Sequence, residues 1–204
     1  MAKPSFFLFA VMLACTACVT LSEDDLRRSA KAEFFFGNYE KAMENASALL
    51  RIVPGDHDAL QIRYLIFAHN HQYDLAVREL DEIVRRGVEN ASDLNRRCLY
   101  KALVGRELES ALADCNAALA RSPSFYAAWS NRGLVHLRSG RWVEAIADYN
   151  RALELEQEFA DASFGRGIAK LRLGEVESGT ADIATALKLN PEIENEYAVD
   201  GIKR

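Results

Sequence analysis

Histidine, cysteine and serine are the side chains of this sequence that could supply metal ligands, a nucleophile or a proton relay. None of the four histidines stands four residues from another, which is the spacing of paired metal ligands on a helix. Asp56 and Asp58 flank His57, a pattern typical of helix capping. Gly165 and Gly167 lack the further glycines and the flanking strand of a phosphate-binding loop, and no serine lies in a nucleophile motif. We therefore expect no catalytic residue, no metal and no cofactor.

Two of the four cysteines, Cys98 and Cys115, stand 17 residues apart in the middle of the chain. Both occupy positions at which related segments of the chain carry small or apolar packing residues. We expect two buried, unbridged side chains, because free cysteine packs as a small apolar residue. The alternative is a disulfide between them, which the oxidising conditions met by an exported protein would permit.

The chain also has a fixed period in its sequence. A large residue followed three positions later by a small one recurs five times, at intervals of 34, 35, 34 and 34 residues. The pairs are Tyr39/Ala42, Tyr73/Ala76, Leu108/Ala111, Trp142/Ala145 and Val176/Gly179. A period of this length is typical of stacked repeats. Within the best-defined period, Trp142, Ala145, Ile146 and Tyr149 share one helical face, which predicts two short amphipathic helices in each unit.

The residues of the fourth period carry a resemblance to a known family. Residues 126–159 hold, at the corresponding positions, Trp129, Gly133, Gly140, Ala145, Tyr149 and Ala152. This pattern resembles the tetratricopeptide repeat (TPR). The resemblance implies an all-α, right-handed TPR superhelix of about five helix-turn-helix repeats. We place the array at 23–193, its repeats at 23–56, 57–90, 92–125, 126–159 and 160–193, and a C-terminal cap at 194–204.

The TPR resemblance also implies where a partner would bind. The first helices of the pairs line the concave face of such a superhelix, which holds a protein or peptide ligand. The exposed residues expected there are Arg96, Tyr100, Asn131, Leu134, Arg138, Phe164, Ile168 and Arg172. Apolar side chains mixed with separate positive charges favour an extended peptide, or a helix with acidic flanks. The alternative for Leu134, Phe164 and Ile168 is that they pack against the adjacent repeat.

One known use of this face is the clamp by which some TPR domains hold the carboxylate of a chaperone tail. Asn131 corresponds to the central asparagine of that clamp, and Arg96 could serve as one of its basic residues. Tyr100 replaces a second asparagine, and Asp161 stands where the clamp needs a cation. An acid does not hold a carboxylate, so we expect no carboxylate clamp in this chain.

The N-terminal segment differs in character from the repeats. Lys3 precedes an unbroken apolar run from Phe6 to Ala14, which is too short for the roughly 20 residues of a membrane-spanning helix. Residues 1–17 therefore resemble a signal peptide with a lipobox. Cys15 is the first choice for lipidation and Cys18 the second; the alternative is a leader that is removed without lipidation. By resemblance, we expect a bacterial envelope protein held at the periplasmic face of the outer membrane.

Charge and composition narrow the class of partner. The net charge is -5, and no dense stripe of lysine and arginine occurs that would neutralise phosphates, so we expect no nucleic acid ligand. The expected function is that of a non-enzymatic adaptor or scaffold, a membrane-anchored TPR lipoprotein. The alternative is a soluble or self-associating periplasmic structural protein, because the terminal repeats of an array can stack between copies.

Overall fold

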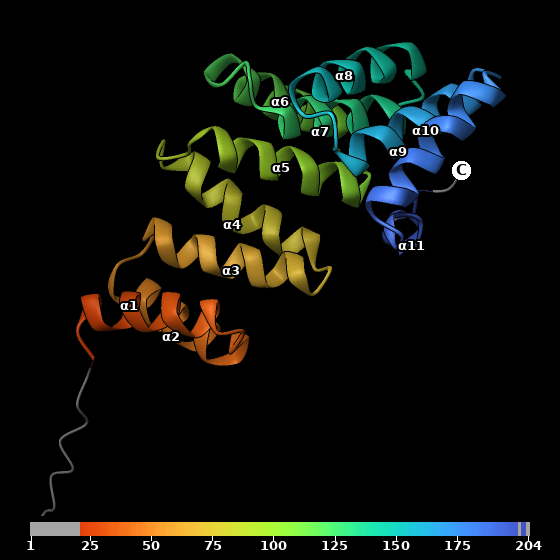
Figure 1. Ribbon diagram of the computed structural model, residues 1–204. Coiled ribbons are helices and arrows are strands. Elements are labelled where there is room, and N and C mark those ends of the chain that lie inside the picture. Colours follow the sequence, from red (N-terminus) through yellow and green to blue (C-terminus); the bar gives the residue numbers. More distant parts are fainter. Residues whose placement is uncertain (1–20, 200, 203–204) are drawn as a thin grey trace, which may run out of the picture.

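The computed structural model describes residues 21–199 and 201–202, which form eleven α-helices (Figure 1). The predicted signal peptide and both candidate lipidation sites, Cys15 and Cys18, lie outside the described residues. No strand occurs within the described range. The helices are α1 (Glu23–Phe35), α2 (Tyr39–Ile52), α3 (His57–His69), α4 (Tyr73–Arg85), α5 (Ala91–Val104), α6 (Leu108–Arg121), α7 (Tyr126–Arg138), α8 (Trp142–Leu155), α9 (Ala160–Arg172), α10 (Val176–Leu189) and α11 (Ile193–Val199).

Helices α1 to α10 form five antiparallel pairs that stack in chain order (Figure 1). Each helix packs against its neighbours in the sequence, and the first helices of successive pairs also touch, as α5 touches α7 and α7 touches α9. Contacts therefore remain between neighbouring units, and the helices do not surround a single centre. The predicted all-α solenoid is confirmed.

The turn within each pair depends on a left-handed backbone conformation that recurs with the repeat. Gly37, Gly105, Gly140 and Gly174 all have φ between 72° and 84° in these turns. Glycine adopts this conformation without a Cβ clash. In the second pair His71 takes the same place with φ 55°, and its ring nitrogen Nδ1 lies 2.9 Å from the Tyr73 hydroxyl. The histidine at this position is thus part of a turn.

Side-chain caps start several of the first helices. Asp56 precedes α3, and its Oδ1 accepts a hydrogen bond of 2.9 Å from the Ala59 N–H. Asn90 and Asp93 form a reciprocal capping box at the start of α5. These bonds satisfy backbone donors that have no partner inside the helix. The capping role predicted for Asp56 is confirmed.

Small residues allow the two helices of each pair to approach closely. Ala42, Ala76, Ala111 and Ala145 of the periodic pattern are fully buried. In the fifth pair, a Cβ added at Gly179 would lie 2.9 Å from the carbonyl oxygen of Gly167 on the facing helix. Contacts of that length are too short for carbon, which explains why glycine replaces alanine in this repeat.

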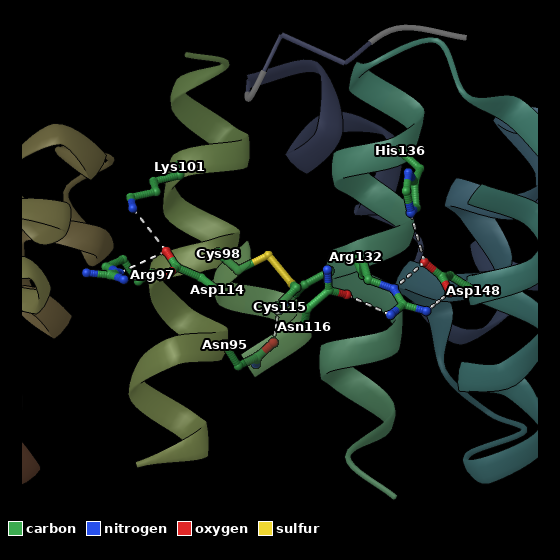
Figure 2. Close-up of a disulfide and its surroundings, with 11 residues drawn as sticks. Asn95, Arg97, Cys98, Lys101, Asp114, Cys115, Asn116, Arg132, His136 and Asp148 are labelled. Carbon is green, nitrogen blue, oxygen red and sulfur yellow. Dashed lines mark hydrogen bonds and ion pairs between the residues drawn. A yellow bond between two sulfur atoms is a disulfide. The ribbon is translucent and has the colours of Figure 1, made fainter. Parts of the chain in front are cut away.

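An arginine on the first helix of four repeats joins three helices, a feature that sequence reasoning did not find. Arg132 on α7 donates to both carboxylate oxygens of Asp148 on α8, at 2.8 and 2.6 Å, and to Asn116 on α6 at 2.9 Å (Figure 2). The equivalent sets are Arg63 with Glu79 and Ser47, Arg97 with Asp114 and Asp81, and Arg166 with Asp182 and Asn150. Each arginine therefore ties its own pair to the preceding one. We call these groups the arginine bridges.

A second basic residue shares the carboxylate of three bridges. Lys101 contacts Asp114 at 3.0 Å, Lys170 contacts Asp182 at 2.8 Å, and His136 Nε2 lies 3.5 Å from Asp148. Burial lowers the pKa of His136, and the Asp148 carboxylate opposes this only in part. Burial acts to raise the pKa of Asp182, but hydrogen bonds from its two cationic partners outweigh it and lower that pKa.

Cys98 on α5 and Cys115 on α6 form a disulfide inside the third repeat (Figure 2). Their Cα atoms are 5.4 Å apart, which is within the usual range for a bridge. Our expectation of two unbridged cysteines was therefore wrong. The physical reason is that the two residues lie directly opposite each other across the helix pair, so the separation that favours apolar packing also suits a covalent bond. Both side chains are fully buried, as predicted.

Candidate protein-binding groove

A cavity of about 390 Å³ opens between the first helices of the last three repeats and the C-terminal helix. Its walls come from α5, α7, the start of α9, and α11 with the residues that follow it. The apolar lining comprises Leu99, Leu103, Phe125, Ala127, Leu134, Phe159 and Ile202, and the polar lining Ser92, Asn95, Arg96, Ser130, Asn131, Asp161, Glu196 and Tyr197. A cavity of this size, largely apolar with a few polar groups, can hold several side chains of a peptide.

Three of the predicted partner-binding residues, Arg96, Asn131 and Leu134, meet in this cavity. The Asn131 side-chain amide donates a hydrogen bond of 2.8 Å to Asn95 Oδ1. The Arg96 guanidinium lies 6.0 Å from the centre of the Tyr64 ring. Asn95 was not among the predicted residues, although its place on the same helix as Arg96 could have drawn attention to it. The two asparagines together offer donors and acceptors to a peptide backbone.

A neighbouring hollow of about 220 Å³ is lined by the predicted residue Ile168 and by two predicted arginines, Arg138 and Arg172. Both have interactions within the protein, so they are not isolated charges. Ile202 lines this hollow as well as the larger cavity. The two spaces therefore adjoin at the C-terminal segment, and together we call them the groove.

Four predicted partner-binding residues are far less exposed than we expected. Phe164 and Ile168 on α9 are each 1% exposed, and Leu134 and Tyr100 are each 5% exposed. The expectation that α9 presents Phe164 and Ile168 to a ligand was therefore wrong. Tyr197 on α11 packs edge-on against the Phe164 ring, with 4.7 Å between the ring centres. The C-terminal helix covers the apolar face that would otherwise meet a partner, so the packing alternative holds for this repeat.

Tyr100 is held in a cluster of aromatic rings between the second and third repeats. It stacks on Tyr73 with ring centres 5.8 Å apart, and Tyr64 lies 6.4 Å away. Burial raises the pKa of Tyr64 to about 12, so its hydroxyl stays protonated at neutral pH. That hydroxyl donates to Asp93, a fully buried carboxylate whose other oxygen lies 2.9 Å from His57 Nε2. These contacts fix α3 against α5 and position one wall of the groove.

Two carboxylates, Asp161 and Glu196, give the cavity a negative end that we did not predict. Within the described part of the chain, no side chain donates to the Asp161 carboxylate, and Asn190 is the one side chain that donates to Glu196, at 3.1 Å. Burial raises the pKa of Asp161, and the Glu196 charge raises it further. The sequence marked Asp161 only as a residue that breaks the clamp pattern. Asp161 and Glu196 line the same cavity because α11 folds back onto α9.

The described residues show neither a metal centre nor a membrane helix. No three residues of the metal-ligating types gather at one point among them. No helix in the described part of the chain is long and apolar enough to cross a bilayer. What the geometry offers instead is an open face with apolar, polar and charged walls.

Comparison with protein families identifies the repeats. Two models described as tetratricopeptide repeat match the sequence, one over residues 126–159 and the other over residues 144–192. The chain contains tetratricopeptide repeats. The matched residues form helices α7 to α10, of which α7 and α9 line part of the groove. No curated protein matches the sequence closely enough to be reported as a relative.

Solved TPR structures share the fold over most of this TPR chain. YrrB, described as a TPR protein with an unusual peptide-binding site, has a TM-score of 0.69 at 15% identity, covering 89% of this chain and 93% of its own. MamA from Desulfovibrio magneticus RS-1 has a TM-score of 0.72 at 16% identity, covering 83% and 96%. TTC0263, a thermophilic TPR protein of Thermus thermophilus, has a TM-score of 0.66 at 21% identity, covering 88% and 98%. At these identities the likeness concerns the fold alone.

Proposed function

We propose that this TPR protein is a non-enzymatic adaptor whose groove binds a peptide segment of a partner protein. The observation that carries the proposal is the cavity of about 390 Å³, in which Arg96, Asn95 and Asn131 stand beside an apolar wall. Asparagine side chains can hold a peptide backbone, the apolar wall takes an aliphatic or aromatic side chain, and charge fixes the direction of the segment. YrrB, whose fold is similar, is described as having a peptide-binding site, which is in keeping with this use of the fold.

The charged residues of the groove restrict the chemistry of the expected ligand further than the sequence alone could. Arg96 lies in the same cavity as Asp161 and Glu196, so the cavity has a basic and an acidic end. A ligand with acidic flanks alone would be repelled by the acidic end. We therefore expect a segment with an apolar residue between an acidic and a basic one, because such a segment places opposite charges at both ends.

The test is partner capture by the full chain from solubilised envelope material, with three proteins compared side by side. The first is unchanged and the second carries Arg96→Ala and Asn131→Ala in the groove. The third carries Lys188→Glu, an exposed charge on α10 that does not line the groove. We expect the first and third to capture the same proteins and the second to lose at least one of them. Identical captures by all three would contradict the proposed role of the groove.

The adaptor is further proposed to act in the bacterial envelope, lipidated at Cys15, or at Cys18 as the second choice, on the periplasmic face of the outer membrane. The leader-like sequence supports this location, and so does the Cys98–Cys115 bridge, because structural disulfides persist in oxidising compartments. Several acyl chains at about 0.8 kcal/mol per buried methylene would hold the chain at a bilayer.

Metabolic labelling with a fatty acid tests the anchor. We expect label in the unchanged chain, and none in the variant in which the modified cysteine, Cys15 or Cys18, is replaced by alanine. The Cys98→Ala/Cys115→Ala chain is the matched control, because it loses two cysteines of the repeats and keeps both candidate sites. Equal labelling of all these chains, or no labelling of any, would contradict lipidation at this position.

The alternative function, a self-associating structural protein, rests on a different surface. Phe35 and Phe36 lie at the end of α1 in the first repeat and are 83% and 74% exposed. Two exposed aromatic side chains of this kind can pack against the surface of a second copy of the chain. Light scattering at high concentration distinguishes the two functions: a monomeric mass that does not change with Phe35→Ser/Phe36→Ser rejects self-association through this pair.

A further inference from the structure

The hydroxyl of Tyr149 is a buried polar group without a partner. Tyr149 lies on α8, its side chain is fully buried, and its hydroxyl oxygen has no hydrogen-bond partner among the described residues. Its ring lies between two glycines. A Cβ at Gly133 on α7 would be 2.9 Å from the ring atom Cε1, and a Cβ at Gly165 on α9 would overlap the hydroxyl. Phenylalanine would fill the space between these helices without burying an unpaired hydroxyl, so packing does not explain the tyrosine.

The position of Gly165 places this hydroxyl next to Asp161. Residues 161 and 165 are one turn apart and share one face of α9. Burial raises the pKa of Tyr149 well above its ordinary value, and the negative charge of Asp161 raises it further, as expected for neighbouring groups. Asp161 lines the cavity of about 390 Å³. The hydroxyl thus reaches the face of α9 that borders the cavity.

Glu196 brings a third acceptor to this end of the cavity. It lies on α11 and lines the cavity together with Asp161. Burial raises the pKa of Asp161, and the Glu196 charge raises it further. In the described part of the chain, the neutral amide of Asn190 is the one side-chain donor to either carboxylate. The Arg96 guanidinium, which lines the same cavity, lies 6.0 Å from the centre of the Tyr64 ring. Acceptors from three helices therefore meet where the described residues supply no cation.

An arginine bridge shows what a carboxylate inside this array normally has as a partner. Asp182 accepts hydrogen bonds of 2.8 and 2.6 Å from Arg166 and lies 2.8 Å from the Lys170 ammonium. Charge-assisted hydrogen bonds of this kind compensate a carboxylate for its removal from water. The pKa of Asp182 is lowered by its cations, whereas the pKa of Asp161 is raised. Asp161 thus borders a cavity at the place where Asp182 has two basic side chains.

We propose that Asp161, Glu196 and the Tyr149 hydroxyl form a site that binds the cationic end of a lysine or arginine side chain of the partner. Both cations carry N–H donors and no acceptor, which suits three acceptors in one place. The Tyr149 hydroxyl can accept from the cation and donate to the Asp161 carboxylate at the same time. This inference rests on the proposed function and deepens it, because it assigns the basic residue of the bound segment to named groups of the groove.

Three blocked dipeptides serve as probes of the full chain. They are acetylated and amidated leucyl-lysine, leucyl-arginine and leucyl-norleucine; norleucine has nearly the length of lysine without its charge. Ligands of this size bind with a Kd on the order of 1 mM, which NMR titration measures. We expect at least one cationic dipeptide to bind about tenfold more tightly than the norleucine dipeptide, because hydrogen bonds to charged groups are the stronger ones. The tighter of the two cationic dipeptides identifies the preferred cation.

Variants of the full chain assign the binding to the proposed groups. Asp161→Asn/Glu196→Gln should weaken binding of the cationic dipeptide about tenfold and leave the norleucine dipeptide unchanged. Tyr149→Phe should weaken the cationic dipeptide about threefold, since it removes one neutral hydrogen-bonding group. The matched control is Glu177→Gln, which neutralises an exposed carboxylate on α10 away from the groove and should change neither affinity.

Melting temperatures separate a binding role from a structural one. The raised pKa of Asp161 means that folding disfavours its charged form at neutral pH, so Asp161→Asn should not lower the melting temperature. Tyr149→Phe should not lower it either, because the hydroxyl has no partner to lose among the described residues. The variants that lose binding should therefore be as stable as the unchanged chain.

Several results would overturn the proposal. They are equal binding of the three dipeptides, no binding of any of them, or a preference for the cation that survives Asp161→Asn/Glu196→Gln. A lower melting temperature of Tyr149→Phe would also contradict it, because the hydroxyl would then have a structural bond. Partner capture that depends on Arg96 and Asn131, together with any of these results, would leave the groove function standing and remove only the cation site.

Discussion

The arginine bridges should contribute strongly to the stability of the repeat array. Replacement of Arg132 by alanine removes two hydrogen bonds to Asp148 and one to Asn116. It also removes a guanidinium that lies 4.6 Å from the centre of the Trp129 ring. Asp148 stays behind with an exposed fraction of only 7%, next to His136, whose pKa is lowered by burial. The carboxylate would therefore lose both hydrogen bonds from its guanidinium partner.

The contacts give an upper and a lower limit for the loss in the free energy of unfolding. Loss of one partner of a fully buried pair costs about 3–5 kcal/mol, but the Arg132 side chain is 21% exposed, so water can replace part of its role. The cation–π contact adds about 0.5–1 kcal/mol. We expect Arg132→Ala to lower the free energy of unfolding by about 2–4 kcal/mol, since both terms apply only in part. At roughly 2–4 °C for each kcal/mol in a chain of this size, the melting temperature should fall by about 5–15 °C.

Urea unfolding followed by circular dichroism measures this change, and the chain contains a matched control. Arg151 on α8 pairs with Glu154 at 2.7 Å, but the two side chains are 47% and 63% exposed. Arg151→Ala should cost no more than about 0.5 kcal/mol, because water screens the exposed pair. The double variant Arg132→Met/Asp148→Leu should recover most of the loss, because no unpaired charge remains. Equal losses for Arg132→Ala and Arg151→Ala would refute the reasoning.

Three further predictions concern the third and fifth repeats. Cys98→Ala/Cys115→Ala should lower the free energy of unfolding by about 2–4 kcal/mol, and thiol labelling of the unfolded, unreduced chain should leave both cysteines unmodified; labelling of both would show that no bridge forms. Gly179→Ala should lower the melting temperature although alanine is usual in this slot, because the new Cβ would meet the facing backbone at 2.9 Å; an unchanged melting temperature would contradict the close approach. Asp182→Asn should destabilise the protein more at pH 7 than at pH 3. The lowered pKa means that the carboxylate stabilises above about pH 4 and that this contribution is lost as the pH falls through the folded-state pKa; equal losses at both pH values, by urea unfolding, would disprove it.

The repeat and its local geometry follow from the order of the residues along the chain. Large and small residues recur at the period of one helix pair, and glycines such as Gly140 and Gly174 recur in the left-handed turns, so each unit follows from its own residues. Stacking such units gives a solenoid without information from elsewhere, since each pair contacts only its neighbours. For the same reason, Arg96 and Asn131 could be predicted to lie together in the groove from their places on the first helices.

Features that depend on packing between helices, or on the C-terminal helix, could be seen only in the folded chain. The Cα atoms of Cys98 and Cys115 lie 5.4 Å apart in the disulfide. The repeat period of the sequence does not specify this distance. The burial of Phe164 and the acidic pair of Asp161 with Glu196 both follow from the way α11 folds over α9, and α11 lies outside the five-repeat pattern. The repeat pattern fixes which face of a helix is apolar, whereas only the packed neighbour determines whether that face stays open to a partner.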